Sequence, residues 1–450
     1  MREINVSLLS SFLLIVISTY IFEVIYNLPS PAGDGAQFLK VTFNICRYDT
    51  FTLYGSEAGN KYTHHGWLPW YLKSKLNLNC QYSFIFLFNF LVKLITLFFS
   101  YLFLKDKINK NYVFIILFFI FVIQLKLQFR PENFALMLTS IIFYLNNKNY
   151  YKFVPIFFGL LLYSHFIFFC FLTLFFIIYF YRTYLNLKIF IESVFIFVFT
   201  LFILDLIYPY SLINYLEGNI IQNSNTWTKG ASFDIWLFIE YYVITKIHGG
   251  GFLPLWGIIF FLVIFVLLKK NKLFFFSIPF LYYFSLRNIP GNYYMIGLTP
   301  VLLYLSIYFD KKNNFEKSKI INILFSLILL ITIVGYSHYF ARNILTIKYF
   351  KNDYENTLSF INNNLDEIDK VPSFGFLLND KIKLESYKIR SCQNCNNSNT
   401  KKKYNLTEVN GTKNPCPDDI SNNKDFSIKL FGKKIFNSNS GYGIYICKIN

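Results

Sequence analysis

The sequence VSLLSSFLLIVISTYIFEVIYNL (residues 6–28) is a long apolar run, and the Pro/Gly-rich segment PSPAGDGAQF (residues 29–38) follows it directly. A run of this length can cross the ~30 Å hydrocarbon core of a membrane as one α-helix. It is longer than the apolar part of a typical signal peptide, it carries Glu23 near its end, and no small-residue cleavage motif follows. We therefore expect a retained first membrane helix that places Asp34 on flexible backbone at its exit.

Apolar runs of similar length recur along the chain. Its 450 residues are 54% hydrophobic and 21% aromatic, with 56 Phe and 35 Tyr. This pattern predicts an all-α polytopic membrane protein with about 11 transmembrane helices. The transmembrane domain would span residues 1–336. The polar region 337–450 has strand-like runs after an amphipathic helix, and it would form a small α/β domain.

The basic residues indicate the orientation of these helices. The net charge is +18, and many Lys and Arg residues lie in short tracts between apolar runs, from Lys105 to Lys317. Such tracts are typical of cytoplasmic loops, whereas a nucleic-acid-binding protein gathers its charge on one face. We expect a cytoplasmic N-terminus, an extracytoplasmic C-terminal domain and no nucleic-acid partner. The abundance of Phe, Tyr, Ile, Asn and Lys suggests an AT-rich genome. Together with the scarcity of sorting signals, it favours a bacterial inner membrane.

The apolar run from Phe153 to Tyr181 has two interpretations. It could be one tilted, kinked helix, or two short helices that turn near Tyr163-Ser164-His165. With one helix, the basic tracts that follow would face outward, whereas with two helices every tract from Lys105 to Lys317 faces the cytoplasm. The positive-inside rule therefore predicts two helices, with His165 near the outer surface.

Two polar loops are long for connections between membrane helices. The first outer loop covers residues 29–81 and the second covers residues 209–251. Because long loops tend to carry function, we expect the site of this protein in these loops. Four cysteines lie in the C-terminal region, and they predict disulfides if that region faces an oxidising compartment, with zinc as the alternative for the CxxC pair. They are Cys392, Cys395, Cys416 and Cys447.

A carboxylate on a loop at the outer membrane face, with cations on other loops, suits one kind of chemistry. In a sugar attached to a polyprenyl phosphate, the lipid tail lies in the bilayer and the phosphate lies at the interface. An enzyme that transfers the sugar needs a base for the acceptor hydroxyl and cations for the departing phosphate. Asp34 could supply the base, and Arg or Lys residues of the outer loops could supply the cations.

The order of these motifs resembles that of the GT-C fold glycosyltransferases, more narrowly the protein mannosyltransferase and aminoarabinose transferase type. The matching elements are Asp34-Gly-Ala-Gln-Phe38, then His64-His65-Gly-Trp-Leu-Pro69, then Arg130-Pro131-Glu132 after the third helix. Arg287, before a Pro/Tyr segment, resembles the late outer loop that approaches the lipid phosphate. The resemblance covers roughly residues 6–309.

The resemblance implies an inverting hexosyl- or pentosyltransferase with a lipid, glycan or protein acceptor. Asp34 would be the general base. Arg287, Arg130 and Lys246 would bind the donor phosphate. The residues expected to contact substrates are His64, His65, Trp67, Glu132, His248 and Tyr293. Simpler roles stay open, because Arg130 and Glu132 could pair to fix a helix end, and Trp67 could belong to an interfacial aromatic belt.

One departure bears on cofactors. Many members of this group carry a second acid directly after the first-loop Asp, whereas Gly35 follows Asp34 here. We therefore expect metal-independent chemistry and no cofactor, with Asp205 and Asp234 as other possible acids. Two alternatives to the glycosyltransferase remain. One is a polysaccharide polymerase or ligase that uses a lipid diphosphate, and the other is a lipid-linked sugar transporter or flippase.

Overall fold

A computed structural model of the chain describes part of its length. The described residues are 6–26, 42, 45–46, 66–77, 80–127, 130–184, 186–207, 212, 216, 322–323, 325–337, 339–341, 344, 359–360, 363–364, 367–370, 404–408, 427–430, 433–437 and 444–448. The chain divides into two compact units. Unit 1 holds residues 1–20, 62–69 and 88–337, and unit 2 holds residues 21–61, 70–87 and 338–450.

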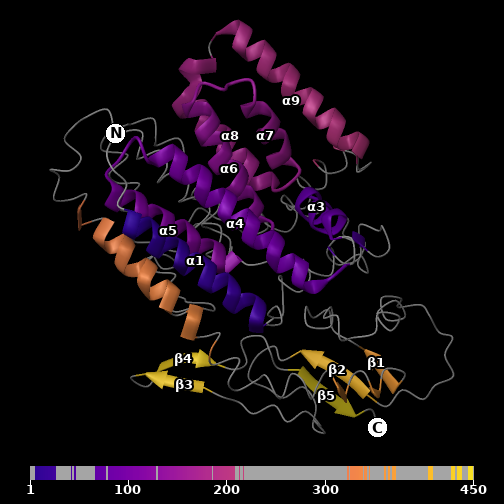
Figure 1. Cartoon of the computed structure of the whole chain (residues 1–450). Helices are drawn as coiled ribbons and strands as arrows, with labels where there is room; N and C mark the ends of the chain where they lie inside the picture. Colours follow the sequence, from indigo (N-terminus) through magenta and orange to yellow (C-terminus); the bar gives the residue numbers. More distant parts are fainter. Residues whose placement is uncertain are drawn as a thin grey trace, which may run out of the picture. The chain divides into compact units, whose positions relative to one another are not determined.

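The described part is mostly helical (Figure 1). Its helices are α1 (Val6–Tyr26), α3 (Leu68–Leu76), α4 (Tyr82–Leu104), α5 (Lys110–Leu127), α6 (Glu132–Asn147), α7 (Val154–Leu162), α8 (Phe166–Tyr184) and α9 (Leu187–Ile207). A further helix, Phe325–Ala341, is drawn in orange in Figure 1. The apolar run at residues 6–28 contains α1, as expected from the sequence.

Unit 2 contains short strands in the C-terminal part of the chain. They are β1 (Ile368–Lys370), β2 (Tyr404–Glu408), β3 (Ser427–Leu430), β4 (Lys433–Asn437) and β5 (Ile444–Lys448). One sheet has the order β1-β2-β5, in which β2 is parallel to β1 and antiparallel to β5. Strands β3 and β4 form a separate antiparallel pair.

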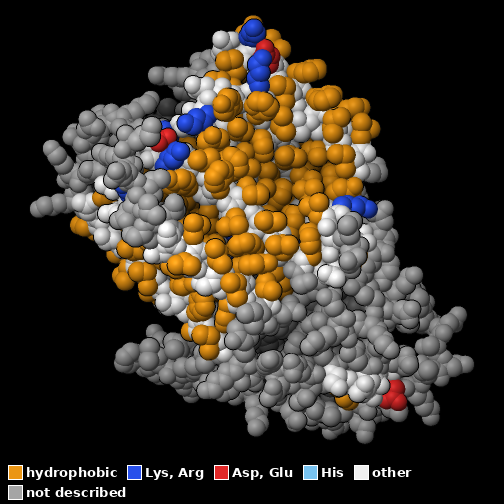
Figure 2. Space-filling view, in the orientation of Figure 1, with side chains coloured by type: hydrophobic (Ala, Val, Ile, Leu, Met, Phe, Trp, Pro, Cys, Tyr) orange, Lys and Arg blue, Asp and Glu red, His pale blue; other side chains and the backbone are white. Residues whose placement is uncertain are grey.

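Two described helices are long and apolar enough to cross a membrane, by length and composition. They are Phe84–Leu104 in α4 and Leu187–Ile207 in α9. The outer face of α9 exposes large apolar side chains to an unusual degree, with Phe195 70% exposed and Leu206 65% exposed. Figure 2 shows hydrophobic side chains covering the visible face of the helical region, with Lys and Arg at its margins. Such a surface is unfavourable in water, and it fits a lipid environment.

Helices α1, α5 and Phe325–Ala341 run in the same direction. Tyr112, near the start of α5, has its ring 4.5 Å from that of Phe325, whereas Phe121, further along α5, lies 6.4 Å from Tyr336. On α1, the Thr19 hydroxyl lies 2.9 Å from the Tyr336 hydroxyl. The earlier residue Phe12 packs 5.7 Å from Phe114. Helices α1, α5 and Phe325–Ala341 are therefore parallel and adjacent (Figure 1).

The run from Phe153 to Tyr181 forms two helices, as predicted from charge parity. Helix α7 ends at Leu162, a turn covers residues 163–165, and α8 begins at Phe166. The ring of Phe158 in α7 lies 5.2 Å from the ring of Phe176 in α8. A single kinked helix would separate these two rings by roughly 27 Å, at 1.5 Å per residue. The chain therefore folds back at this turn, and the one-helix alternative is wrong.

The ends of the unit 1 helices differ in character. The turn between α7 and α8 and the connection between α5 and α6 lie at one end, which we call the loop end. The connections from α4 to α5, α6 to α7 and α8 to α9 lie at the opposite, basic end. The described lysines of these connections and of the helix turns beside them are Lys105, Lys107, Lys110, Lys148, Lys152 and Lys188.

Candidate functional site at the loop end of unit 1

A segment of the first loop pairs with the turn between α7 and α8. The Gly66 amide donates to the Ser164 carbonyl oxygen at 3.0 Å, and the Leu68 amide donates to the Tyr163 carbonyl oxygen at 3.2 Å. A Cβ at Gly66 would lie 1.7 Å from the Tyr163 oxygen, so no other residue fits there without a backbone shift. This close approach fixes the place where the first loop meets the helices.

Trp67 anchors the same segment through its side chain. It is 1% exposed, and its ring lies 5.5 Å from the buried ring of Tyr163. Burial of a large aromatic side chain is a strong apolar contribution to the free energy of folding. In this structure Trp67 holds the segment in place, and its contact with a substrate stays a prediction.

The motif Arg130-Pro131-Glu132 lies between α5 and α6. Pro131 has φ −65° and is followed by Glu132 as the first residue of α6, a place where the missing proline N–H costs nothing. The Arg130 guanidinium binds one carboxylate oxygen, Glu132 Oε1, through Nη2 at 2.8 Å and Nε at 3.0 Å. Both side chains are buried, with 10% and 0% exposure. This geometry agrees with the simpler interpretation of the pair, in which it fixes the end of the helix.

His165 lies beside this ion pair. Its Nδ1 accepts the Phe168 amide at 3.3 Å, so the side chain caps the N-terminus of α8. It is fully buried, and it interacts electrostatically with Glu132 and Arg130. Burial lowers the pKa of His165 to about 4, an effect that Glu132 opposes and Arg130 reinforces. The imidazole is therefore neutral at physiological pH.

Arg130, Glu132 and His165 form a cluster at the loop end, and further polar groups extend it into α4 and α5. The Gln124 amide nitrogen donates to Thr96 Oγ1 at 2.9 Å, and the Asn133 amide nitrogen donates to the Gln124 backbone oxygen at 3.2 Å. Glu132 Oε2 and Gln124 Oε1 are buried and accept no hydrogen bond from the described residues. A buried acceptor without a donor is costly, so these two oxygens suit a bound water or hydroxyl group.

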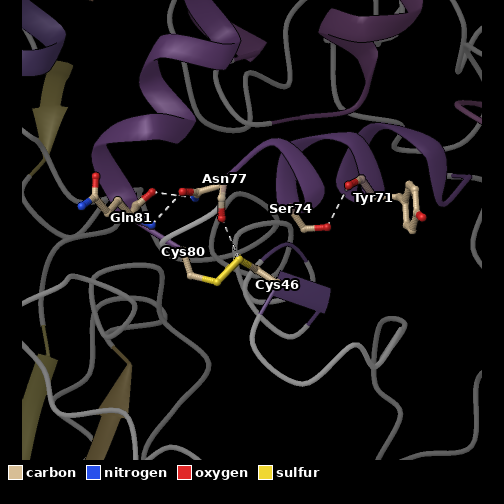
Figure 3. The surroundings of a disulfide bond; sticks show 6 residues. All are labelled: Cys46, Tyr71, Ser74, Asn77, Cys80 and Gln81. Carbon is tan, nitrogen blue, oxygen red and sulfur yellow. Dashed lines mark hydrogen bonds between the residues drawn. A yellow bond between two sulfur atoms is a disulfide. The ribbon is translucent and has the colours of Figure 1, made fainter.

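A disulfide closes the first loop within unit 2. Cys46 and Cys80 are joined, with their Cα atoms 5.9 Å apart (Figure 3). Asn77 shapes the turn that carries Cys80, because its side chain exchanges two 2.8 Å hydrogen bonds with the Gln81 backbone. The Asn77 carbonyl oxygen accepts the Cys80 amide at 2.9 Å and lies 3.2 Å from Cys46 Sγ. This pair was not expected from the sequence, where only the four C-terminal cysteines were predicted to form disulfides.

Most of the predicted site residues lie outside the described part of the chain. They are Asp34, His64, His65, Lys246, His248, Arg287 and Tyr293, together with Cys392, Cys395 and Cys416. Cys447 is placed on strand β5. Of the predicted site residues, the structure brings together Trp67, Arg130 and Glu132 at the loop end. Within the described residues, no three His, Cys, Asp or Glu side chains form a group that could hold a metal ion.

Two residues that meet at the loop end, Gly66 and Tyr163, had no role expected from the sequence. The sequence feature that could have indicated Gly66 is its place between two histidines and Trp67. A glycine among large side chains often marks a close approach of another backbone segment. Comparison of the chain with protein-family models, with curated proteins and with solved structures gives no match in any of the three.

Proposed function

We propose that this chain is an integral membrane glycosyltransferase of the GT-C type. It would move one sugar from a polyprenyl-phosphate donor to an acceptor hydroxyl at the extracytoplasmic face, with inversion at the anomeric carbon. The observation that carries the proposal is the meeting of three sequence motifs at one end of unit 1. They are Gly66–Leu68, Arg130–Glu132 and the turn at residues 163–165.

The directions of the helices support the proposed orientation. Helices α1, α5 and Phe325–Ala341 are parallel, which agrees with an odd number of crossings, about 11 on a ~20-residue span, between the two termini. The lysines at the basic end suit the cytoplasmic side. The disulfide between Cys46 and Cys80 suits an oxidising compartment for the first loop. On this account the C-terminal region forms an extracytoplasmic α/β domain of a bacterial inner-membrane protein.

In the proposed reaction Asp34 takes the proton of the acceptor hydroxyl. The hydroxyl oxygen then attacks the anomeric carbon, and the polyprenyl phosphate departs with the bonding electrons. Arg287 and Lys246 stabilise the charge that develops on the phosphate. Because Arg130 is paired with Glu132, its charge is largely balanced within the protein. We therefore assign the donor phosphate chiefly to Arg287, and we give Arg130 a supporting role.

The loop-end cluster gives Glu132 a defined place in this scheme. One oxygen binds Arg130, and the other is buried and accepts no hydrogen bond from the described residues. A carboxylate with a spare acceptor is suited to a sugar hydroxyl or an ordered water. The proposed substrate contacts are therefore Glu132 together with His64, His65, Trp67, His248 and Tyr293.

The test measures sugar release from a panel of lipid-linked sugar donors. The full chain, purified in detergent, is incubated with labelled polyprenyl-monophosphate sugars and, separately, with sugar-diphosphate lipids. The proposal predicts sugar release from a monophosphate donor, with a product of inverted anomeric configuration. Turnover of diphosphate donors alone would favour a polymerase or ligase. Vesicle-to-vesicle movement of an intact lipid-linked sugar would favour a transporter.

A further inference from the structure

Tyr163 joins three parts of the chain at the loop end. It is fully buried in the turn between α7 and α8. Its carbonyl oxygen accepts the Leu68 amide at 3.2 Å, and its ring lies 5.5 Å from that of Trp67. Its hydroxyl donates to Asp205 Oδ1 at 2.5 Å. One residue therefore contacts the first loop through its backbone and ring, and contacts α9 through its hydroxyl.

The hydroxyl contact completes a close interface between α7 and α9. One turn before Tyr163, a Cβ added to Gly159 would lie 2.9 Å from the Thr200 methyl group. Small residues at such positions let two membrane helices approach closely. Because Gly159 faces Thr200 and Tyr163 faces Asp205, the two helices run in parallel, and both end at the loop end.

Asp205 lies two residues before the C-terminal end of α9 at Ile207. The second long loop, residues 209–251, follows in the sequence. A hydrogen bond to a carboxylate is stronger than one between neutral groups, so it holds the end of α9 more firmly than packing alone. The C-terminal end of α9, which the second loop follows in the sequence, is thus tied to the same turn that receives the amides of Gly66 and Leu68.

We propose that Tyr163 is a positioning residue that sets the first loop in register with the C-terminal end of α9. Its hydroxyl fixes the turn at residues 163–165 on α9, and the turn then fixes Gly66–Leu68 through two backbone hydrogen bonds. The Gly66–Leu68 segment of the first loop and the C-terminal end of α9 are thereby held to one turn. The consequence for catalysis rests on the proposed glycosyl transfer, whereas the mechanical coupling stands on the contacts alone.

Hydrogen–deuterium exchange of the full-length protein in detergent tests the coupling without any substrate. Tyr163→Phe removes only the hydroxyl, Asp205→Ala removes the acceptor, and Asp205→Asn keeps an acceptor oxygen. We expect the Gly66 and Leu68 amides to exchange about tenfold faster in Tyr163→Phe and Asp205→Ala, the factor expected for loss of one such hydrogen bond. Asp205→Asn should exchange at a rate between that of the native chain and that of Asp205→Ala, because a neutral acceptor replaces the carboxylate.

Tyr112→Phe is the matched control. Its hydroxyl also joins two helices, by a bond to Asn322, but at the opposite end of α5. This variant should leave exchange at Gly66 and Leu68 unchanged. Native exchange in both Tyr163→Phe and Asp205→Ala would overturn the proposal, as would equal acceleration in the Tyr112→Phe control.

An activity measurement extends the test to catalysis. Misplacement of the loops should lower kcat by about tenfold with little change in the donor KM, and the double variant Tyr163→Phe/Asp205→Ala should lose no more than either single variant. Additive losses would overturn the coupling. If the native chain transfers no sugar while the exchange results hold, the positioning role stands and the proposed function fails.

Discussion

The Gly66 amide nitrogen lies 3.0 Å from the Ser164 carbonyl oxygen, and this contact joins the first loop to the turn between α7 and α8. The contact requires glycine, because a Cβ would lie 1.7 Å from the neighbouring Tyr163 oxygen. The same turn presents His165 to Arg130 and Glu132. One backbone pairing thus gathers motifs that are far apart in the sequence.

Gly66→Ala should destabilise the protein by about 2 to 3 kcal/mol, because the added methyl group meets a backbone oxygen that cannot turn aside. Gly159→Ala is the comparison, since its methyl group would lie 2.9 Å from a side-chain methyl group, that of Thr200, and not against a backbone oxygen at 1.7 Å. Thermal unfolding in detergent should therefore show a larger loss for Gly66→Ala. An equal or smaller loss would contradict the close approach at Gly66.

Loss of the disulfide should destabilise the first loop. Cys46 and Cys80 are 34 residues apart, and a closed loop of this length contributes about 3 to 4 kcal/mol in the chain-entropy model. Cys46→Ser and Cys80→Ser should each expose one additional reactive thiol to maleimide under denaturing, non-reducing conditions. Cys170→Ser, which removes a free cysteine, should instead lower the thiol count. A thiol count lowered by one in Cys46→Ser and in Cys80→Ser, as in Cys170→Ser, would show that the pair is not joined.

Stability should fall with acidity because of His165. Burial holds its pKa at about 4 in the folded protein, against 6.5 ordinarily. Between these values the unfolded chain binds a proton that the folded chain does not, so the free energy of unfolding decreases as pH falls from about 6.5 to about 4. The full effect is on the order of 3 kcal/mol, at 1.36 kcal/mol per pKa unit.

His165→Asn isolates this effect, since asparagine can still cap α8 but does not titrate. Thermal unfolding of both proteins at pH 7.5 and pH 5 should show a steeper loss for the native chain. Equal losses in both proteins would contradict a neutral buried His165.

The ion pair between Arg130 and Glu132 should respond asymmetrically to mutation. Glu132→Gln leaves the buried guanidinium without its carboxylate, and breaking a buried pair in this way costs about 3 to 5 kcal/mol. Replacing both partners, as in Arg130→Met/Glu132→Leu, should cost less than Glu132→Gln alone. Denaturant unfolding measures the free energy of unfolding of both variants. A double variant less stable than Glu132→Gln would contradict a buried, mutually balanced pair.

The helices were predictable because their length and apolar content follow from the thickness of a membrane. The predicted first helix began at Val6, as α1 does, and the apolar run from Phe153 to Tyr181 forms the two predicted helices. The turn at residues 163–165 was predictable because charge parity allowed only one of two arrangements. These properties depend on local composition, which a single sequence displays.

The contacts at the loop end could not be predicted from the sequence in the same way. The pairing of Cys46 with Cys80 depends on the path of a long loop, and a cysteine's partner cannot be deduced from sequence alone. The bond between Tyr163 and Asp205 depends on the parallel packing of α7 and α9. The roles of Asp34, Arg287 and Lys246 stay predictions, because these residues lie outside the described part of the chain.

A comparison of three purified proteins tests whether Asp34 is the base of the proposed sugar transfer. Purified native chain, Asp34→Asn and the control Asp106→Asn, which changes an exposed carboxylate at the basic end, are compared for sugar transfer from a polyprenyl-phosphate donor. We expect transfer by the native chain and the control, and a loss of at least about 100-fold in Asp34→Asn. Equal transfer by all three proteins would contradict it.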